Sequence, residues 1–247
     1  MISVCIATYN GERYIKEQLI SILEQLGVED EVVICDDQSS DRTLAIIDEC
    51  RDVRLRVCRN PARLGHVRNF EKAISLAKGD YIFLADQDDV WIPGRVQNMM
   101  DALQAYPQAL LVSSNFDLID AKGAETGEFR GLGPVRRLRW LQVAAIFAGK
   151  APYYGCTFLM RREALRYCLP IPADIESHDI WFALVASALG RVVNLPSSTL
   201  QHRLHGSNVT ARSRRAWKVV LRSRLVFAWA LVSRLFCLRC KKLEGTN

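Results

Sequence analysis

The stretch Gly79-Asp80-Tyr81-Ile82-Phe83-Leu84-Ala85-Asp86-Gln87-Asp88-Asp89-Val90-Trp91 decides the fold of this chain. Its residues 81–85 form a short apolar run of β-forming side chains, which predicts a strand buried on both faces in a parallel sheet. Three carboxylates then follow within four residues. Carboxylates this close repel one another unless a cation or a ring of donors lies among them, and oxygen ligands suit Mg²⁺ or Mn²⁺. The stretch therefore predicts a metal site at the carboxyl end of a strand, where open α/β sheets bind ligands.

A simpler alternative gives these carboxylates a local role. Asp88 or Asp89 would cap the helix that Pro93 is expected to begin. One helix cap needs only one carboxylate, so capping does not explain why two further acids lie beside it. The metal site is therefore the favoured interpretation.

Composition indicates one large α/β domain with a small extension. The chain has 247 residues, 49% of them hydrophobic, which is enough for a sizeable core. It opens directly on a strand-like run rather than a secretory signal, so we expect a cytoplasmic location. The cysteines are scattered without metal-ligand spacing, and we interpret them as reduced thiols.

The net charge of +6 is concentrated near the C-terminus. Eleven basic residues and no acid lie between Arg203 and Lys242, while the remainder of the chain is net negative. We expect residues 1–210 to form the main domain and residues 211–247 a basic amphipathic helical tail. The longest apolar run of this tail, Leu225 to Val232, is too short to span a bilayer. Two alternatives stay open: the tail lies on the anionic inner face of the cell membrane as a peripheral anchor, or it packs on its own domain. Nothing in it resembles a nucleic-acid-reading module.

Strand and helix patterns alternate in the first third of the chain. Strands are predicted at Ile2–Thr8, Glu31–Cys35 and Arg54–Cys58, each followed by apolar residues at helical spacing. This alternation is typical of a mainly parallel sheet flanked by helices. Another strand is predicted at Ala109–Ser113, and Asn115–Gly133 is expected to form loops or a short hairpin.

Four segments in a fixed order carry a family resemblance. They are Ser3-Val4-Cys5-Ile6-Ala7-Thr8-Tyr9-Asn10, then Asp36-Asp37-Gln38-Ser39, then Asn69-Phe70 with Gly79-Asp80-Tyr81, and Asp86-Gln87-Asp88-Asp89. Together they resemble family 2 inverting glycosyltransferases, most of all the bacterial rhamnosyltransferase-like enzymes of polysaccharide assembly. The resemblance implies a GT-A-type nucleotide-diphospho-sugar transferase fold.

The resemblance also implies which residues hold a nucleotide-diphospho-sugar donor. Thr8, Tyr9, Asn10 and Asp37 would contact the base and ribose; a carboxylate can accept a pyrimidine N–H while an aromatic face stacks on the ring. Arg68 would assist at the phosphates or the sugar. For Asp36 we expect instead a turn contact with backbone amides.

The acidic stretch matches the family's Asp-x-Asp motif through Asp86 and Asp88. The resemblance implies that a cation held there, Mg²⁺ or Mn²⁺, bridges the diphosphate of the donor.

A second informative segment is Glu176-Ser177-His178-Asp179-Ile180-Trp181, which begins a predicted helix. An aspartate at a helix start is most often a cap. The resemblance points elsewhere, because the family carries its catalytic base at this position. It implies that Asp179 is the general base and that His178 orients it or the acceptor.

A third segment, Arg203-Leu204-His205-Gly206-Ser207-Asn208, resembles the family's Arg-x-His-x-x-Asn pattern. There the histidine approaches the metal or the diphosphate, whereas a lone histidine is more often structural, and both interpretations of His205 stay open. Two carboxylates and an imidazole would slightly favour Mn²⁺.

The resemblance implies sugar transfer with inversion to a glycan or lipid-linked acceptor in bacterial surface polysaccharide assembly. Asp179 would take the acceptor proton, and no second acid is needed when a cation holds the leaving diphosphate. Rhamnose from a thymidine diphosphate donor is the favoured sugar. Two alternatives remain. A nucleotidyltransferase would show a glycine-rich phosphate loop, which Ala7 to Gly11 does not supply. A silent homologue would scaffold a membrane complex.

Overall fold

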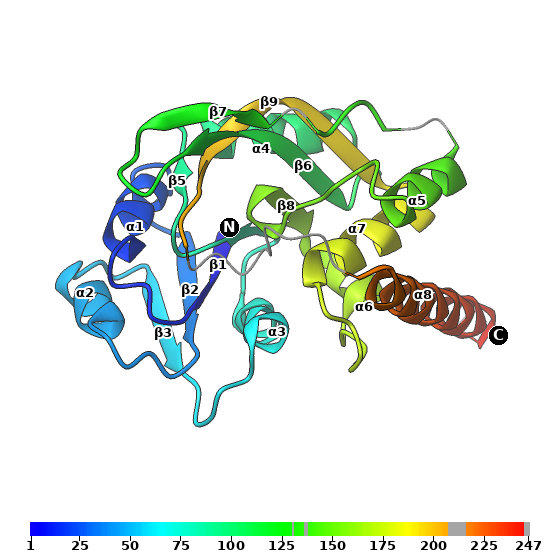
Figure 1. Cartoon of the computed structure of the whole chain (residues 1–247), viewed down its shortest axis with the longest axis horizontal. Helices are drawn as coiled ribbons and strands as arrows, with labels where there is room; N and C mark the ends of the chain where they lie inside the picture. Colours follow the sequence, from blue (N-terminus) through cyan, green and yellow to red (C-terminus); the bar gives the residue numbers. More distant parts are fainter. Residues whose placement is uncertain (130, 136–137, 207–215, 245–247) are drawn as a thin grey trace.

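The structure is a computed structural model that describes residues 1–129, 131–135, 138–206 and 216–244. Its described strands form one curled mixed sheet in the order β3-β2-β1-β4-β8-β6-β9-β5, with β7 paired to β6 (Figure 1). The strands are β1 (Ile2–Thr8), β2 (Glu31–Asp36), β3 (Leu55–Arg59), β4 (Tyr81–Ala85), β5 (Val90–Trp91), β6 (Leu111–Ile119), β7 (Glu125–Phe129), β8 (Phe158–Arg161) and β9 (Val192–Arg203). The helices are α1 (Ile15–Leu23), α2 (Thr43–Glu49), α3 (His66–Leu76), α4 (Arg95–Ala105), α5 (Arg139–Phe147), α6 (Leu165–Cys168), α7 (His178–Ala188) and α8 (Trp217–Glu244).

The first four strands of the sheet order are parallel, as the alternating pattern predicts. Thr8 of β1 is paired with Asp36 of β2, and Ile6 of β1 with Ala85 of β4. The carboxyl ends of these strands therefore lie at one edge of the sheet, where the predicted nucleotide and metal segments emerge together. Strand β4 is buried at residues 82–85, which confirms the expected central strand.

The second half of the sheet is antiparallel in part, which the alternation alone did not predict. Strand β8 pairs antiparallel with β4 and with β6, and β6 pairs with β7 in the expected hairpin. The long strand β9 runs parallel to β6 and then meets β5, where Gln201 pairs with Val90. Because the end of β9 lies beside β5, residues 202–205 lie next to the acidic stretch.

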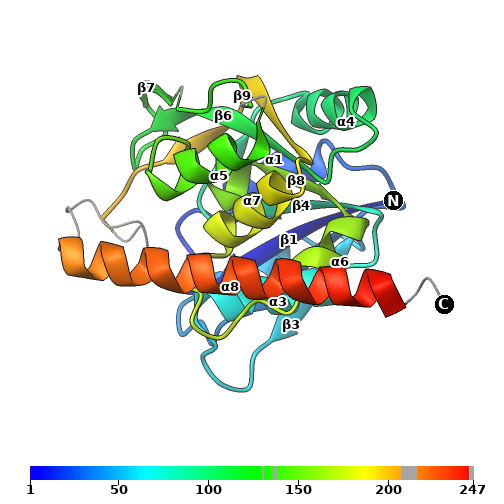
Figure 2. The ribbon, with the colours of Figure 1, turned by 90° about the vertical axis from the view of Figure 1, so that its right-hand side faces the viewer.

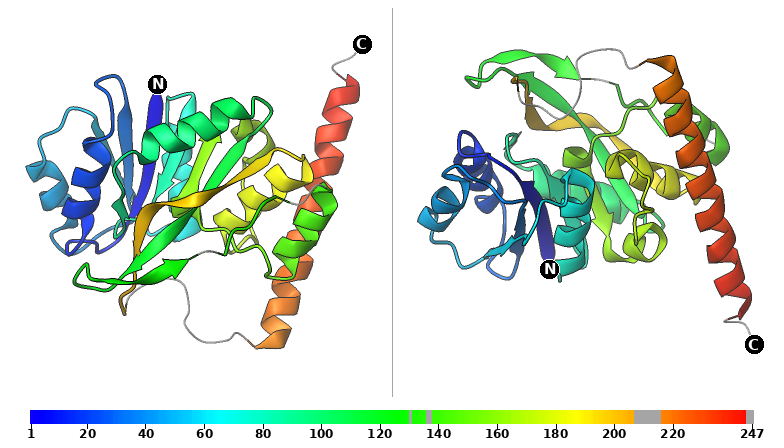
Figure 3. Two further views of the ribbon diagram at one scale, coloured as in Figure 1. Left: turned by 90° about the horizontal axis from the view of Figure 1, so that it is seen from above. Right: turned by 60° about the horizontal axis from the view of Figure 1, so that its bottom comes forward.

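Helix α7 packs against the second half of the sheet, and α8 lies outside α7 (Figure 2, Figure 3). Helix α7 is almost wholly buried, with Trp181, Phe182 and Leu184 in the core. Helix α8 runs along the outside of this half and packs against α7. The predicted boundary between domain and tail, at residues 210 and 211, lies outside the described residues. Within the described chain no helix has the length and apolar character needed to cross a bilayer.

The structure removes both local explanations for the site aspartates. Helix α4 begins after Gly94 with no side-chain cap, so neither Asp88 nor Asp89 caps it. Helix α7 is capped by Ser177, whose hydroxyl accepts a hydrogen bond from the Ile180 backbone nitrogen at 3.3 Å. Asp179 is therefore not needed as a cap.

Candidate functional site

An acidic cluster forms directly after β4. One carboxylate oxygen from each of Asp86, Asp88 and Asp89 lies within 4.8 Å of the others. Burial, followed by the negative charges of Asp89 and Asp88, raises the pKa of Asp86 well above its ordinary value of 3.8. Three crowded carboxylates are therefore unfavourable in the chain alone, and a cation among them would relieve the repulsion.

Asp89 is held from behind by β9. Its Oδ1 accepts a hydrogen bond from the Arg203 backbone nitrogen at 3.1 Å and lies 2.9 Å from His202 Nδ1. Burial opposes ionisation of Asp89, but the charge and hydrogen bond of His202 outweigh it and hold the pKa of this carboxyl below 3.8. The other oxygen, Oδ2, is buried and has no hydrogen-bond partner in the described part of the chain. A buried, unpartnered carboxylate oxygen in an oxygen-rich cluster fits a divalent cation.

The third predicted segment joins the first through His205 and Arg203. His205 Nε2 lies 2.7 Å from Asp88 Oδ2, and its ring packs on Tyr14 at 4.9 Å. The buried Arg203 guanidinium donates to the Asp88 backbone carbonyl at 2.9 Å and to Glu17 Oε2 at 2.6 Å. The structure thus places His205 at the acidic cluster, where an imidazole can act as a metal ligand.

The loop after β1 is tied to the acidic stretch by Gln87. The Tyr9 backbone nitrogen donates to Gln87 Oε1 at 2.9 Å, and Gln87 Nε2 donates back to the Tyr9 carbonyl at 3.1 Å. The Tyr9 ring is 37% exposed, and the Arg63 guanidinium lies 3.7 Å from its centroid. A partly exposed aromatic ring of this kind can stack on a nucleotide base, and the contact of Tyr9 with the base stays a prediction.

Thr8, Asn10 and Asp36 shape the loops. The Thr8 hydroxyl donates to Asp36 Oδ2 at 3.1 Å, and the Asn10 side chain accepts from the Ser40 backbone nitrogen at 2.9 Å. Asp36 Oδ1 accepts from the Ser39 backbone nitrogen at 3.0 Å, the turn contact expected for it. The side chains of Thr8 and Asn10 therefore hold the loops after β1 and β2 together.

Asp37 organises the loop before α3. Its carboxylate accepts from the backbone nitrogens of Leu64 at 2.7 Å and Gly65 at 2.9 Å, and from Asn60 Nδ2 at 2.9 Å. Burial raises the pKa of Asp37, but these hydrogen bonds prevail and lower it. With 3% of the residue exposed, the Asp37 carboxylate is mainly engaged in fixing the conformation of this loop.

Arg68, which was expected to assist at the phosphates or the sugar, is instead engaged by other parts of the chain. It donates to the backbone carbonyls of Ile171 at 2.8 Å and Pro172 at 3.0 Å, and it pairs with Glu71. These contacts brace the loop before α7 against α3. The sequence could not distinguish this role, because the two partners lie about a hundred residues further along the chain.

The predicted catalytic pair lies at the start of α7. His178 Nε2 lies 2.7 Å from Asp179 Oδ1, and the His178 ring stacks on Phe70 at 4.3 Å. The Asp179 side chain is 22% exposed, so a substrate can reach it, whereas that of His178 is 2% exposed. Burial raises the pKa of Asp179, but the neighbouring His178 and then His66 outweigh it and lower the pKa below 3.8. Asp179 is thus an ionised, accessible carboxylate, as a general base requires.

Gly155 allows the base to approach the turn before β8. A Cβ atom on Gly155 would lie 2.6 Å from Asp179 Oδ1 and 2.8 Å from His178 Nε2. Sequence reasoning missed Gly155, because its partners are more than twenty residues away. It also missed His202, and it left Asp89 outside the ligand set.

We expect Gly155→Ala to lower kcat by about 10²-fold, because the added methyl group must displace the base by a large part of an ångström. Binding of the nucleotide should change little. Gly133→Ala is the matched control, since a Cβ there meets no atom within 4 Å. Steady-state kinetics with donor titration check this; equal kcat values for the two variants would contradict the placement of the base.

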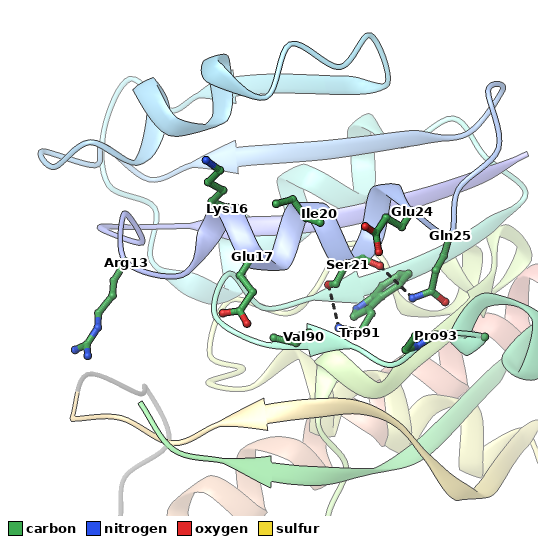
Figure 4. Close-up of a pocket in the computed structure, with 11 residues that line it drawn as sticks. Arg13, Lys16, Glu17, Ile20, Ser21, Glu24, Gln25, Val90, Trp91 and Pro93 are labelled. Carbon is green, nitrogen blue, oxygen red and sulfur yellow. Dashed lines mark hydrogen bonds between the residues drawn. The ribbon is translucent and has the colours of Figure 1, made fainter. Parts of the chain in front are cut away.

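A separate groove of about 770 Å³ lies between α1 and β5 (Figure 4). Its lining includes Lys16, Glu17, Ile20 and Trp91, but none of the cluster carboxylates and not Asp179. It is therefore distinct from the candidate site, although Glu17 connects the two through Arg203.

Comparisons with known proteins agree with this arrangement. The family described as Glycosyl transferase family 2 matches residues 3–169. The dTDP-rhamnosyl transferase RfbG of Shigella flexneri is 31% identical over 175 residues, covering 64% of this chain and 54% of RfbG. The UDP-Glc:alpha-D-GlcNAc-diphosphoundecaprenol beta-1,3-glucosyltransferase WfaP of Escherichia coli is 26% identical over 212 residues, covering 85% of this chain and 80% of WfaP. The chain thus spans only about half the length of RfbG.

A solved structure of S. aureus TarS residues 1–349, in complex with UDP-GlcNAc, has the same fold. It superposes with a TM-score of 0.72 at 20% identity, covering 92% of this chain and 66% of that one. The expected GT-A-type α/β fold is confirmed.

Proposed function

The chain belongs to glycosyltransferase family 2, and from this premise we propose that it transfers a sugar, with inversion, from a nucleotide-diphospho-sugar to a glycan or lipid-linked acceptor. One observation supports this above the others. A Cβ atom on Gly155 would lie 2.6 Å from Asp179 Oδ1, and the thiol of the next residue, Cys156, lies within 4.8 Å of a carboxylate oxygen of Asp89, so the candidate base and the acidic cluster flank one short turn. Asp179 lies in the first turn of α7 and Asp86 directly follows β4, and we infer that both act on one bound substrate.

The two groups divide the work of an inverting transfer. Asp179 accepts the proton of the acceptor hydroxyl as that hydroxyl attacks the anomeric carbon, and the bond to the diphosphate breaks on the opposite face. His178, stacked on Phe70, holds the Asp179 carboxylate in place. Because Asp179 stays ionised, it can act as the base without first losing a proton to water.

The acidic cluster fits a divalent cation, Mg²⁺ or Mn²⁺. Asp86 and Asp88 would hold it with His205, and Asp89, itself held by His202 and Arg203 of β9, would support them. When bound, the cation would neutralise the charge that develops on the leaving diphosphate. Asp86 would in this way also contact the donor.

The donor would lie over the loops after β1 and β2. Tyr9 would stack on the base, and the loop that Asp37 organises would line the ribose side. The likeness to RfbG favours a thymidine diphosphate donor and rhamnose, and WfaP is the precedent for a lipid-linked acceptor. The proposed sugar transfer would be a step in bacterial surface polysaccharide assembly.

A thermal-shift screen of dTDP, UDP and GDP, each with and without Mn²⁺, tests this proposal. One nucleotide at a hundred times its Kd should raise Tm by about 5–10 °C with Mn²⁺. EDTA should remove the shift and stop turnover. Failure of every nucleotide to stabilise the chain would refute donor binding, and full turnover in excess EDTA would refute the metal.

A further inference from the structure

Helix α8 carries apolar side chains on two opposite sides, so a single apolar face does not describe it. On the inner side, Phe227, Ala230 and Leu231 are buried. Arg234 donates to the Leu169 backbone carbonyl at 2.7 Å, and its guanidinium lies 5.5 Å from the Trp181 ring centroid. These contacts dock α8 on α6 and α7 (Figure 2). The second alternative for the tail, packing on its own domain, therefore describes this inner side.

The outer side of α8 carries a second apolar row, here named the outer stripe. At about 100° per residue, its five positions fall within about 80° of one another around the helix axis. The row therefore follows one side of α8 from Leu221 to Phe236. The whole helix has 28 residues and is about 42 Å long. Its members and their exposed fractions are Leu221 (51%), Leu225 (63%), Trp229 (76%), Val232 (62%) and Phe236 (68%).

Basic side chains accompany the outer stripe. Lys218, Arg222 and Arg239 are exposed, and the helix contains no acid before Glu244. At the same angular step, Lys218 and Arg239 fall in the arc of the stripe, one at each end. Long basic side chains can reach lipid phosphates while the apolar residues between them enter the boundary of headgroups and acyl chains.

We propose that the outer stripe binds the anionic surface of a lipid bilayer, with α8 lying in the plane of that surface. Charge decides the choice of partner. A two-fold dimer would set the same stripe of two chains face to face and bring their basic residues together without any acid between them. Anionic lipid headgroups instead complement every exposed charge of this helix.

The same helix contacts the segment that leads to the catalytic base. Ser223 donates to Glu176 Oε1 at 2.8 Å, and Asp179 follows three residues later at the start of α7. A chain bound through the outer stripe would hold α7 close to the membrane. Resting on the proposed function, this places the base near the surface at which a lipid-linked acceptor presents its hydroxyl, on the inner face of the cell membrane.

Co-sedimentation of the full chain with phosphatidylglycerol or phosphatidylcholine vesicles tests the proposal. The variant Leu225→Ser/Trp229→Ser/Phe236→Ser should lower the partition into phosphatidylglycerol vesicles by at least about tenfold. It should fold normally, because all three side chains are exposed.

A matched control removes three exposed apolar side chains elsewhere. Val28, Val53 and Tyr106 are 87%, 97% and 57% exposed and lie outside α8. Their replacement by serine should leave vesicle binding unchanged. Equal losses in the two triple variants would overturn the assignment to the stripe.

The charges are tested separately. Replacing Lys218, Arg222 and Arg239 by glutamine should weaken binding to phosphatidylglycerol vesicles about fivefold per residue. Wild-type binding that is equally strong on phosphatidylcholine, or a stripe variant that loses only self-association and keeps vesicle binding, would overturn the proposal.

The nucleotide thermal shift, repeated on the stripe variant, separates this inference from the proposed function. An unchanged shift with lost vesicle binding is the expected result. Absence of any nucleotide shift in the wild type would refute the transferase proposal alone, and stripe-independent vesicle binding would refute the membrane surface alone.

Discussion

Asp179→Asn should lower kcat by about 10²–10⁴-fold, because the acceptor hydroxyl loses the group that takes its proton. Asparagine keeps the size of the side chain but cannot accept a proton. Donor binding should be nearly intact, because the contacts proposed for the nucleotide come from the loops after β1 and β2. Single-turnover transfer and the nucleotide thermal shift, measured on the same sample, report the two quantities.

The pH dependence of this loss has a definite sign. The pKa of Asp179 lies below 3.8, so its basic form is present at every pH above that value and is lost only as the pH falls through the lowered pKa. The defect of Asp179→Asn should therefore be the same at mildly acidic and at neutral pH. Asp174→Asn, an exposed position five residues earlier, is the control and should be fully active. A parallel loss of nucleotide binding in Asp179→Asn would remove the role of base.

Asp86→Asn should have the second large effect, with opposite signs for activity and stability. Transfer should fall by at least about 10²-fold, because the cluster loses a ligand for the cation that carries the leaving-group charge. In EDTA, however, the variant should be more stable than the wild type. The ionised Asp86 is opposed by burial and by the charges of Asp89 and Asp88. Removing one charge of such a group gains about 1 kcal/mol, or roughly 2–4 °C in Tm.

A residue that only supports the fold would not show this pair of results. Asp48→Asn, at an exposed position of α2, is the control and should change neither quantity. Thermal melts in EDTA and in Mn²⁺ complete the test. If Mn²⁺ stabilised wild type and Asp86→Asn equally, Asp86 would not be a ligand.

Local patterns predicted the first half of the fold well. The apolar run of β4 and the acids after it mark both a buried strand and its carboxyl end, and parallel register aligns the ends of β1, β2 and β4. The second half was harder, because β8 and β9 join the sheet out of chain order. No spacing in the sequence indicates that β9 returns to β5.

The hydrogen-bond partners of individual side chains were the least predictable feature. Arg68 has the charge of a phosphate ligand, yet carbonyls of the loop before α7 take its hydrogen bonds. Asp37 has the charge of a base-binding residue, yet its carboxylate is largely occupied by the loop before α3. In both cases the competing partner is a backbone group that folding alone brings close.

The sequence by itself determined the α/β class and the acidic end of the central strand, whereas the candidate base was indicated by the family resemblance. Composition and residue order along one segment carry that information, since strand burial and charge crowding are local properties. Only the tertiary structure decided that Gly155 lies against Asp179, that Ser177 caps its helix and that α8 leaves an apolar row outside. These depend on which distant segments meet, because a side chain's partners are set by the packing of the whole chain.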